Sequence, residues 1–238
     1  MIQVALVEDN YNSNKLISEK IKSKKDFSLL ACYSNGYDFL YNLSKEKSLP
    51  DVVLLDIEIP KIDGLLCTTF LNYKYPNIKV IGLSNYVNKY LLSEVVSEGA
   101  CCFISKHFCY PNSFLYLKTY GNNDLLEIAL RKASNNEFFI DKLISINNEV
   151  VKTQPTKTIR ENYKKLDTIS LNEFLILNAS NLSFPEIGNL MKKSTHSIKN
   201  YYAKAAELFE VNSRAEITNH CIKYGFIKLP ILYENYFD

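Results

Sequence analysis

The chain lacks any hydrophobic run that approaches the roughly 20 apolar residues needed to span a bilayer. It also lacks a positively charged segment followed by an apolar stretch near its start, which is the pattern of a secretory signal. These two absences argue against a membrane-spanning or exported protein. We expect a soluble, cytoplasmic protein with no membrane partner.

The chain has no excess of one charge sign and no metal-binding cysteine pattern. Its formal net charge is +2 over 238 residues, which by itself indicates no particular partner. A slight basic excess after residue 140 is only weak support for binding to nucleic acid. The six cysteines have no metal-ligand spacing, and most lie in or beside apolar segments. Buried thiols in a reducing compartment are therefore favoured over a disulfide framework.

The first part of the chain, residues 1–140, alternates between short apolar runs and amphipathic stretches. The strand-like runs are Ile2–Val7, Leu29–Cys32, Val52–Asp56, Lys79–Leu83 and Cys101–Ile104. The helix-like segments are Asn12–Lys24, Tyr37–Leu43, Leu65–Tyr73, Lys89–Glu98 and Asp124–Ala133. Apolar strands that alternate with helices predict a parallel sheet covered on both faces. We therefore expect a doubly wound α/β domain of five parallel strands.

The rest of the chain is predicted to be helical. Residues 141–168 are interpreted as a linker, because the stretch from Ser145 to Lys157 is polar and aperiodic. Residues 169–238 are predicted to form an all-α domain. The helices expected after the polar stretch are Ile159–Leu166, Leu171–Asn178, Pro185–Met191, Thr195–Phe209 and Ala215–Tyr224. Ser170 and Glu173 have the spacing of a capping box at the start of the second of these helices.

Five polar residues stand where strand-like runs end: Glu8, Asp9, Asp56, Ser84 and Lys106. Because the carboxyl ends of parallel strands face one crevice, we expect all five side chains in one acidic pocket. Three carboxylates, a hydroxyl and an ammonium suit phosphoryl transfer to an aspartate, which depends on positioning and charge neutralisation. We assign Glu8, Asp9 and Asp56 as ligands of Mg²⁺, and Asp56 also as the phosphoacceptor. Lys106 and Ser84 are assigned to the phosphoryl oxygens.

Over roughly residues 1–140, this set resembles the receiver domain of two-component response regulators. Pro60 and Gly64 stand where that family has a proline and a glycine after its phosphoacceptor. The resemblance implies a flavodoxin-like fold, a partner histidine kinase that phosphorylates Asp56, and the main-chain carbonyl of Glu58 as a further metal ligand.

The same resemblance implies a conformational switch. After phosphorylation Ser84 would move towards the phosphoryl group, and the aromatic residue on the fifth strand, here Phe103, would turn inward. A receiver of this kind is a phosphoacceptor regulator with slow self-dephosphorylation, and not an enzyme in the ordinary sense.

An aromatic-rich insertion of residues 107–123 departs from the receiver pattern, in which the last helix begins soon after the lysine. We favour a local elaboration that packs on the domain's own edge over a contact for a dimer or a partner. The family commonly dimerises through its fourth helix, fifth strand and fifth helix, and the insertion puts that mode in doubt. We interpret His107 as a surface residue.

The segment from Ser183 to Tyr224 has a helix-turn-helix pattern, with its second helix at Thr195–Phe209. That helix is predicted to bury Ile198, Ala205, Leu208 and Phe209. Four lysines and one glutamate lie between residues 184 and 204, which favours a nucleic-acid surface. A recognition helix places its first residues in the major groove, while neighbouring residues hold phosphates. The residues predicted to contact DNA are Lys192, Lys193, Thr195, His196, Ser197, Lys199, Asn200 and Lys204.

This segment resembles the LuxR/NarL-type DNA-binding domain. The resemblance is carried by Ser194, by residues 197–201 and by residues 211–217. It implies that the last helix mediates dimerisation on DNA. Glu210 replaces the usual glycine and Tyr201 the usual histidine, and Glu210 is placed to alter how the recognition helix ends.

The combined reading is a phosphorylation-controlled transcription regulator that binds double-stranded DNA as a homodimer when phosphorylated. One alternative is a signalling adaptor whose helical domain binds protein instead of DNA. Another is a phosphohydrolase with Asp56 as nucleophile. Glu58 argues against this enzyme, because such enzymes usually carry a second aspartate there, and no substrate-cap domain is apparent.

Overall fold

The protein is described here by a computed structural model covering residues 1–46, 48–85, 89–145, 169–224 and 226–227. The predicted helix Ile159–Leu166 and the predicted linker from residue 146 onward lie outside the described residues. No helix in the described part of the chain is both long and apolar enough to cross a membrane.

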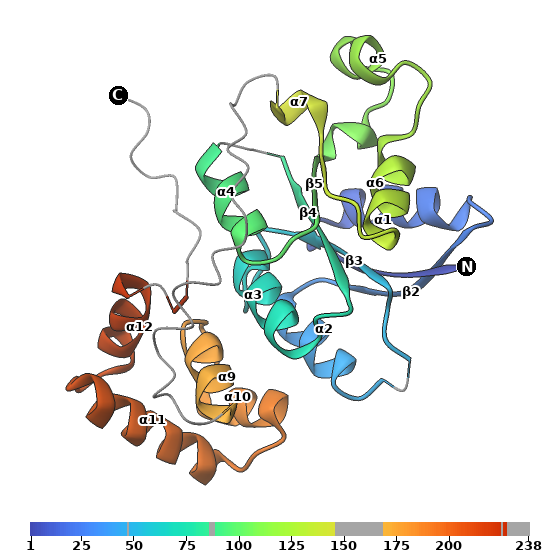
Figure 1. The fold of residues 1–238 in the computed structure, drawn as a ribbon. Helices are drawn as coiled ribbons and strands as arrows, with labels where there is room; N and C mark the ends of the chain where they lie inside the picture. Colours follow the sequence, from blue (N-terminus) through green and yellow to red (C-terminus); the bar gives the residue numbers. More distant parts are fainter. Residues whose placement is uncertain (47, 86–88, 146–168, 225, 228–238) are drawn as a thin grey trace.

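The N-terminal part is built on a parallel sheet in the order β2-β1-β3-β4-β5-β6 (Figure 1). The strands are β1 (Ile2–Val7), β2 (Phe27–Tyr33), β3 (Val52–Asp56), β4 (Lys79–Ser84), β5 (Cys102–Ser105) and β6 (Phe139–Ile140). The doubly wound α/β fold is confirmed, but the predicted count of five strands is wrong. The sixth strand, β6, pairs with the outer edge of β5. It has only two residues, too few to show a period of two in the sequence.

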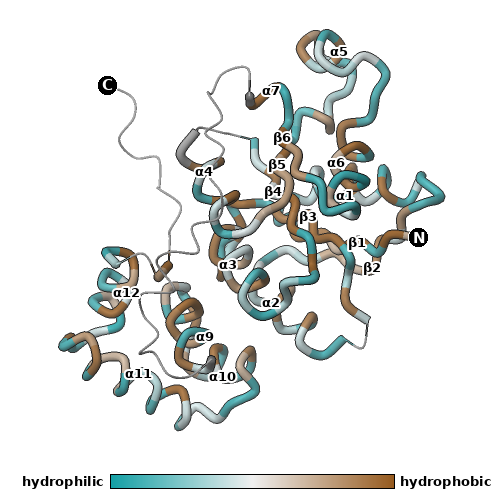
Figure 2. The backbone as a smooth tube through the Cα atoms, viewed as in Figure 1, coloured by the Kyte–Doolittle hydropathy of each residue, from teal (hydrophilic) through white to brown (hydrophobic). Residues whose placement is uncertain are grey.

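Helices cover both faces of this sheet. One face carries α1 (Tyr11–Lys22) and α6 (Leu125–Ser134), and the other carries α2 (Gly36–Leu43), α3 (Gly64–Lys74) and α4 (Lys89–Ser97). Alternate residues of a strand point to opposite faces, so β1 contributes to both apolar cores. Figure 2 shows hydrophobic stretches on the central strands as well as on several helices. Burial on both faces explains why these strands are continuous apolar runs.

The aromatic insertion folds into a short 3₁₀ helix, η1 (Lys106–Cys109), and the helix α5 (Phe114–Tyr120). Tyr116 and Tyr120 are buried in the core on the α1–α6 side, whereas Phe114, Leu115 and Leu117 are exposed. The burial of these two tyrosines agrees with the prediction that the insertion packs on the edge of its own domain. Helix α5 was not predicted from the sequence.

Four helices form the described C-terminal part: α9 (Ile169–Asn178), α10 (Phe184–Met191), α11 (Thr195–Phe209) and α12 (Arg214–Lys223). The predicted capping box at Ser170 is wrong, because α9 already begins at Ile169. A capping box forms instead at the start of α10, between Ser183 and Glu186. Glu210 ends α11 in the left-handed conformation, with φ 55°. This is the conformation that glycine adopts most readily, so the substitution of the usual glycine keeps the turn but strains it.

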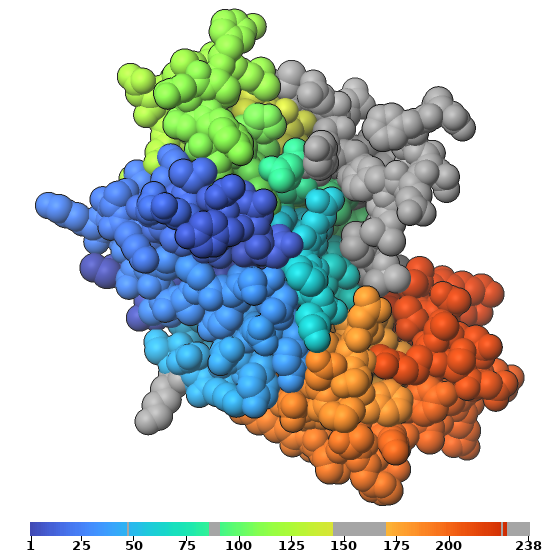
Figure 3. All heavy atoms as spheres, turned by 180° about the vertical axis from the view of Figure 1, so that it is seen from behind, coloured from blue at the N-terminus to red at the C-terminus, as the bar shows by residue number. Residues whose placement is uncertain are grey.

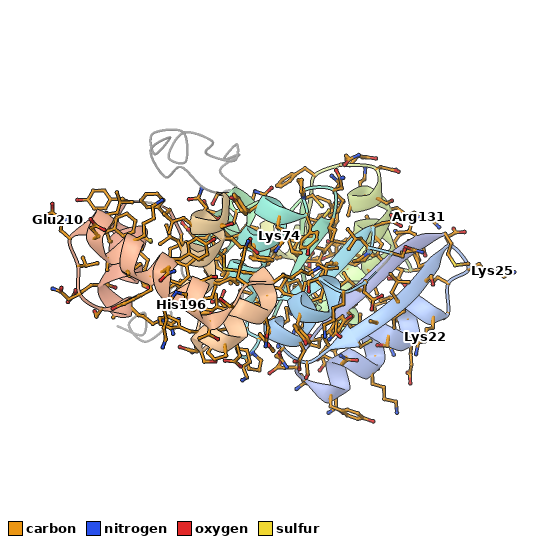
Figure 4. The ribbon with its side chains drawn as sticks, turned by 90° about the horizontal axis from the view of Figure 1, so that it is seen from below. Lys22, Lys25, Lys74, Arg131, His196 and Glu210 are labelled. Atoms are coloured by element: carbon orange, nitrogen blue, oxygen red, sulfur yellow. The ribbon has the colours of Figure 1, made fainter. Side chains whose placement is uncertain are left out.

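The C-terminal helices pack directly on the receiver-like part, with α9 against α3 and α10 against α2 (Figure 3). One apolar cluster runs from the α2–α3 side of the sheet into the helical part. Polar contacts across the junction include Lys74 with Glu173, Lys61 with Glu186, Asn189 with Tyr37, and Lys192 with the Ser44 carbonyl. Figure 4 labels Lys74 at this junction. Helix α7 (Lys142–Ser145) packs on β5 at the other end of the sheet.

Candidate functional site

The carboxyl ends of four neighbouring strands bring the predicted site residues together. Glu8 and Asp9 follow β1, Asp56 ends β3, Ser84 ends β4 and Lys106 follows β5. One carboxylate oxygen from each of the three acidic residues lies within 4.8 Å of the others. The Lys106 ammonium is 2.8 Å from Asp56 Oδ2 and 2.7 Å from Glu8 Oε2. Ser84 is fully buried at the same edge and pairs in register with Ser105, the residue before Lys106.

Backbone groups hold the two buried carboxylates in place. Glu8 Oε1 accepts the amide of Asn10 at 3.1 Å, and Asp56 Oδ1 accepts the amide of Glu58 at 3.3 Å. The loop after Asp56 returns so closely that a Cβ on Gly64 would lie 2.3 Å from the Asp56 carbonyl oxygen. Only glycine fits this approach. The Glu58 side chain is exposed, and its main chain is the part of the residue that lies against Asp56.

Negative charge exceeds positive charge in this pocket, since three carboxylates face one ammonium. Burial raises the pKa of Glu8, and the charge of Asp56 raises it further against the opposing effect of Lys106. Burial alone would lower the pKa of Lys106, but Asp56 and Glu8 outweigh it and raise that pKa. Lys106 is therefore a fixed cation.

A further cation fits the donors that this pocket presents. Glu8 Oε2 is buried and faces the Lys106 ammonium at 2.7 Å, so one cation already lies against this group of three carboxylates. Carboxylate oxygens are the ligands that hard divalent cations such as Mg²⁺ prefer. The acidic cluster of Glu8, Asp9 and Asp56 can therefore hold a metal ion.

Phe103, the predicted switch aromatic, is fully buried. It pairs in register with Gly82 of β4, and a Cβ on Gly82 would lie 2.7 Å from the Phe103 ring. The same Cβ would lie 3.2 Å from Val95 of α4. The ring therefore occupies space that exists because residue 82 has no side chain.

A buried polar cluster next to Lys106 was not predicted from the sequence. It consists of Ser105 at the end of β5, Tyr120 at the end of α5, and Asp141 after β6. Asp141 was assigned to the linker, and Tyr120 was one of several aromatic residues in the insertion. No local pattern links these positions, because they meet only through the pairing of β6 with β5.

The predicted DNA-contacting residues divide into two groups. His196, Lys199, Asn200 and Lys204 are exposed and lie at helical spacing along one face of α11. Figure 1 shows α11 on the side of the helical part that faces away from the sheet, and Figure 4 labels His196. Lys193 is also exposed, in the turn before the helix.

The other predicted residues are already engaged. The Ser197 amide donates to Ser194 Oγ at 3.1 Å, which caps α11, and Thr195 is half-buried. Lys192 Nζ donates to the Ser44 carbonyl at the end of α2, at 2.6 Å. The prediction that Leu208 is buried is wrong, because its side chain is 48 % exposed.

Comparison with known proteins shows what this chain is similar to. Residues 4–114 match the model of the response regulator receiver domain. The chain is 23% identical to the transcriptional regulatory protein DegU of Brevibacillus brevis, with 96% of each chain covered. It is 24% identical to the response regulator protein VraR of Staphylococcus saprophyticus, covering 95% of this chain and 99% of VraR.

Solved structures support the same architecture. RcsB of Salmonella typhimurium aligns with a TM-score of 0.52 at 17% identity, covering 92% of this chain and 98% of RcsB. A structure of two RcsB dimers bound to two parallel DNAs aligns with a TM-score of 0.53 at 17% identity, covering 92% of this chain and 96% of that one. Residues 4–114 therefore match a response regulator receiver domain, and the likeness of nearly the whole chain to DegU and VraR supports a two-component response regulator that acts as a transcription regulator.

Proposed function

We propose that Asp56 is the phosphoacceptor of this response regulator, and that a partner histidine kinase phosphorylates it in the cytoplasm. The observation that carries the proposal is the meeting of Glu8, Asp9, Asp56 and Lys106 at one edge of the sheet. The three carboxylates, with the Glu58 main-chain carbonyl, would hold Mg²⁺. The bound ion would supply positive charge to the phosphoryl oxygens.

The residues of the pocket have separate tasks in the transfer. A carboxylate oxygen of Asp56 forms a bond to the phosphorus of the kinase's phosphohistidine while the P–N bond breaks. The electron pair of the P–N bond stays on the leaving imidazole. Lys106 exchanges its contact with Asp56 Oδ2 for one with a phosphoryl oxygen. The Ser84 hydroxyl, buried at the end of β4, donates to another phosphoryl oxygen. The protein acts as a phosphoacceptor, with slow self-dephosphorylation as its only turnover.

We propose further that the helix-turn-helix domain, residues 169–238, binds double-stranded DNA through α11. The exposed face of His196, Lys199, Asn200 and Lys204 supports this assignment. Thr195 lies at the start of the helix with this face. The residues that would hold phosphates are Lys192 and Lys193 in the turn, together with Ser197 and Lys204. RcsB binds DNA as dimers, which supports a homodimer as the DNA-binding form of this protein once it is phosphorylated.

The phosphoacceptor is tested with the full-length protein, Mg²⁺ and acetyl phosphate as a small phosphodonor. The protein is expected to gain one phosphoryl group, measured by intact mass spectrometry. Asp56→Asn should gain none, because an amide oxygen does not form the acyl phosphate. Asp38→Asn is the matched control, since Asp38 is an exposed aspartate outside the pocket. Labelling of Asp56→Asn at the rate of the unsubstituted protein would contradict the assignment.

A further inference from the structure

Behind the phosphoryl pocket, three elements meet at one fully buried carboxylate. Asp141 follows β6 and has no exposed surface. It lies against Ser105, the last residue of β5, and Tyr120, the last residue of the inserted helix α5. Both of these side chains are also buried. Nothing in the phosphoryl-transfer scheme above uses this cluster.

The hydrogen bonds of Asp141 join the three elements. Asp141 Oδ2 accepts the Ser105 amide at 3.0 Å and also the Ser105 hydroxyl. Asp141 Oδ1 accepts the Tyr120 hydroxyl at 2.5 Å and the Leu143 amide at 2.8 Å. The Tyr120 oxygen in turn accepts the Lys142 amide at 2.8 Å. A buried carboxylate is costly without such donors, so each bond restrains the groups that make it.

Tyr120 is suited to remain a donor in this cluster. Burial raises the pKa of its hydroxyl, and the nearby charge of Asp141 raises it further. The hydroxyl therefore stays protonated over the working pH range. Because Tyr120 comes from the insertion, the restraint depends on an element that the receiver pattern does not include.

The cluster bears directly on Lys106, which follows Ser105 in the chain. Two bonds from Asp141 fix the end of β5 at Ser105, and the Asp141 amide donates to the Phe103 carbonyl at 2.9 Å. The strand is thus held on both sides of residue 104. Lys106 is the first residue after the end of β5, and its ammonium lies 2.8 Å from Asp56 Oδ2. The position of the strand end therefore restrains the position of this ammonium.

We propose that Tyr120 and Asp141 are positioning residues for Lys106, and that the inserted helix α5 serves the phosphoryl site in this way. The proposal rests on the proposed function of the pocket. It predicts that a change at Tyr120 or Asp141 affects the binding of two ligands, the phosphoryl group and the metal, to different degrees. Lys106 meets the phosphoryl group, whereas the metal is held by the carboxylates of Glu8, Asp9 and Asp56. Misplacing Lys106 should therefore weaken the phosphoryl ligand and spare the metal.

The test uses the full-length protein and isothermal titration calorimetry with two probes. The first probe is Mg²⁺ alone, and the second is beryllofluoride, a phosphoryl mimic, at saturating Mg²⁺. Tyr120→Phe is expected to bind beryllofluoride about tenfold more weakly, because a displaced ammonium loses a charge-assisted contact. Its affinity for Mg²⁺ should remain within about twofold of the unsubstituted protein. A general loosening of the domain would weaken both ligands.

Tyr116→Phe is the matched control. Tyr116 lies on the same helix, is equally buried and also uses its hydroxyl, which donates to the Asn123 carbonyl at 2.9 Å. The same hydroxyl accepts the Leu125 amide of α6 at 3.0 Å, but neither bond reaches β5 or Asp141, so this variant should bind both probes normally. Ser105→Ala tests the same prediction at the strand itself. It should also bind beryllofluoride more weakly while keeping its affinity for Mg²⁺, and it serves as the test if Tyr120→Phe fails to fold.

The outcomes distinguish the positioning role of Tyr120 and Asp141 from the phosphoacceptor role of Asp56. Weaker beryllofluoride binding with unchanged Mg²⁺ affinity in Tyr120→Phe or Ser105→Ala, with Tyr116→Phe normal, supports the positioning role. Beryllofluoride affinity unchanged in both variants overturns that role and leaves the phosphoacceptor assignment intact. Equal losses for both probes, or a loss in Tyr116→Phe as large as in Tyr120→Phe, also overturn it. Failure of the unsubstituted protein to bind beryllofluoride overturns the proposed function together with this inference.

Discussion

At the scale of single residues, Asp63, which caps the start of α3, has an unusually high pKa for an aspartate. Its Oδ1 accepts the Leu66 amide at 2.9 Å at the start of α3. Burial nevertheless raises the pKa of Asp63 from 3.8 to about 6, because the backbone hydrogen bonds only partly offset the loss of hydration. The folded state therefore binds this proton more tightly than the unfolded state does.

This raised pKa predicts a pH-dependent stability. The contribution of Asp63 is fully present below about pH 4 and is lost as the pH rises through about 6. Asp63→Asn removes the titrating group and keeps a good cap. Between pH 4.5 and 7.5, the free energy of unfolding of the natural protein should fall by about 2 kcal/mol relative to the variant. Urea unfolding of both proteins at the two pH values measures this change. If the difference in free energy of unfolding between the natural protein and the variant is the same at both pH values, the prediction is contradicted.

Residue-level prediction worked best where one residue type at a strand end carries the chemistry. Glu8, Asp9, Asp56 and Lys106 follow apolar runs, so the rule for parallel sheets was enough to bring them together. Asp141 had no such signal. It follows a strand of two residues, and its partners come from elements distant in sequence.

At the scale of elements, the pairing of β4 with β5 holds the predicted switch aromatic. Gly82 lies opposite Phe103, and the Phe103 ring occupies the space over Gly82. A glycine inside a strand weakens it unless another group uses the space. Here the buried ring of Phe103 uses it.

This arrangement predicts a steric conflict in Gly82→Ala, whose Cβ would meet the Phe103 ring at 2.7 Å. Overpacking of this kind should destabilise the receiver by about 1–3 kcal/mol. A smaller partner should relieve it, so Gly82→Ala combined with Phe103→Leu should lose less than the sum of the two single changes. Thermal or urea unfolding of the four proteins gives the coupling. Strict additivity would show that the two positions do not share this space.

Elements differ in how far the sequence predicts them. The bounds of β1, β3 and α11 are those predicted, because long periodic or continuous apolar runs define them. Helix α5 was missed because it has only seven residues, and its Phe114, Leu115 and Leu117 stay exposed. Their apolar character therefore gives no amphipathic pattern. The strand count was wrong for a related reason, since β6 is stabilised by pairing and not by its own sequence.

At the scale of the whole molecule, the two domains share an interface that the sequence analysis did not anticipate. Glu173, predicted to cap α9, instead pairs with Lys74 of α3, and its side chain is only 9% exposed. Lys192 donates to the Ser44 carbonyl at the C-terminal end of α2, where a helix carries partial negative charge. Lys192 cannot make that contact and hold a DNA phosphate at the same time.

Breaking the Lys74–Glu173 pair should therefore loosen the docked arrangement. Lys74→Ala leaves a largely buried carboxylate without its cation, at a cost of about 1–3 kcal/mol to the interface. We expect a larger radius of gyration by small-angle X-ray scattering and several-fold tighter DNA binding. Lys132→Ala is the control, because its pair with Glu137 is exposed and lies within the receiver. An unchanged radius of gyration would show that the pair does not hold the domains together.

The most direct test of the whole account is fluorescence-anisotropy binding to duplex DNA from upstream of the protein's own gene, or to a selected duplex pool. Salt and Mg²⁺ are held fixed, because phosphate contacts make affinity salt-dependent. The account predicts that beryllofluoride tightens binding. It also predicts that Lys199→Ala, on the exposed face of α11, weakens binding with or without the mimic. Equal affinity with and without beryllofluoride, or full binding by Lys199→Ala, would contradict a pathway from Asp56 to DNA.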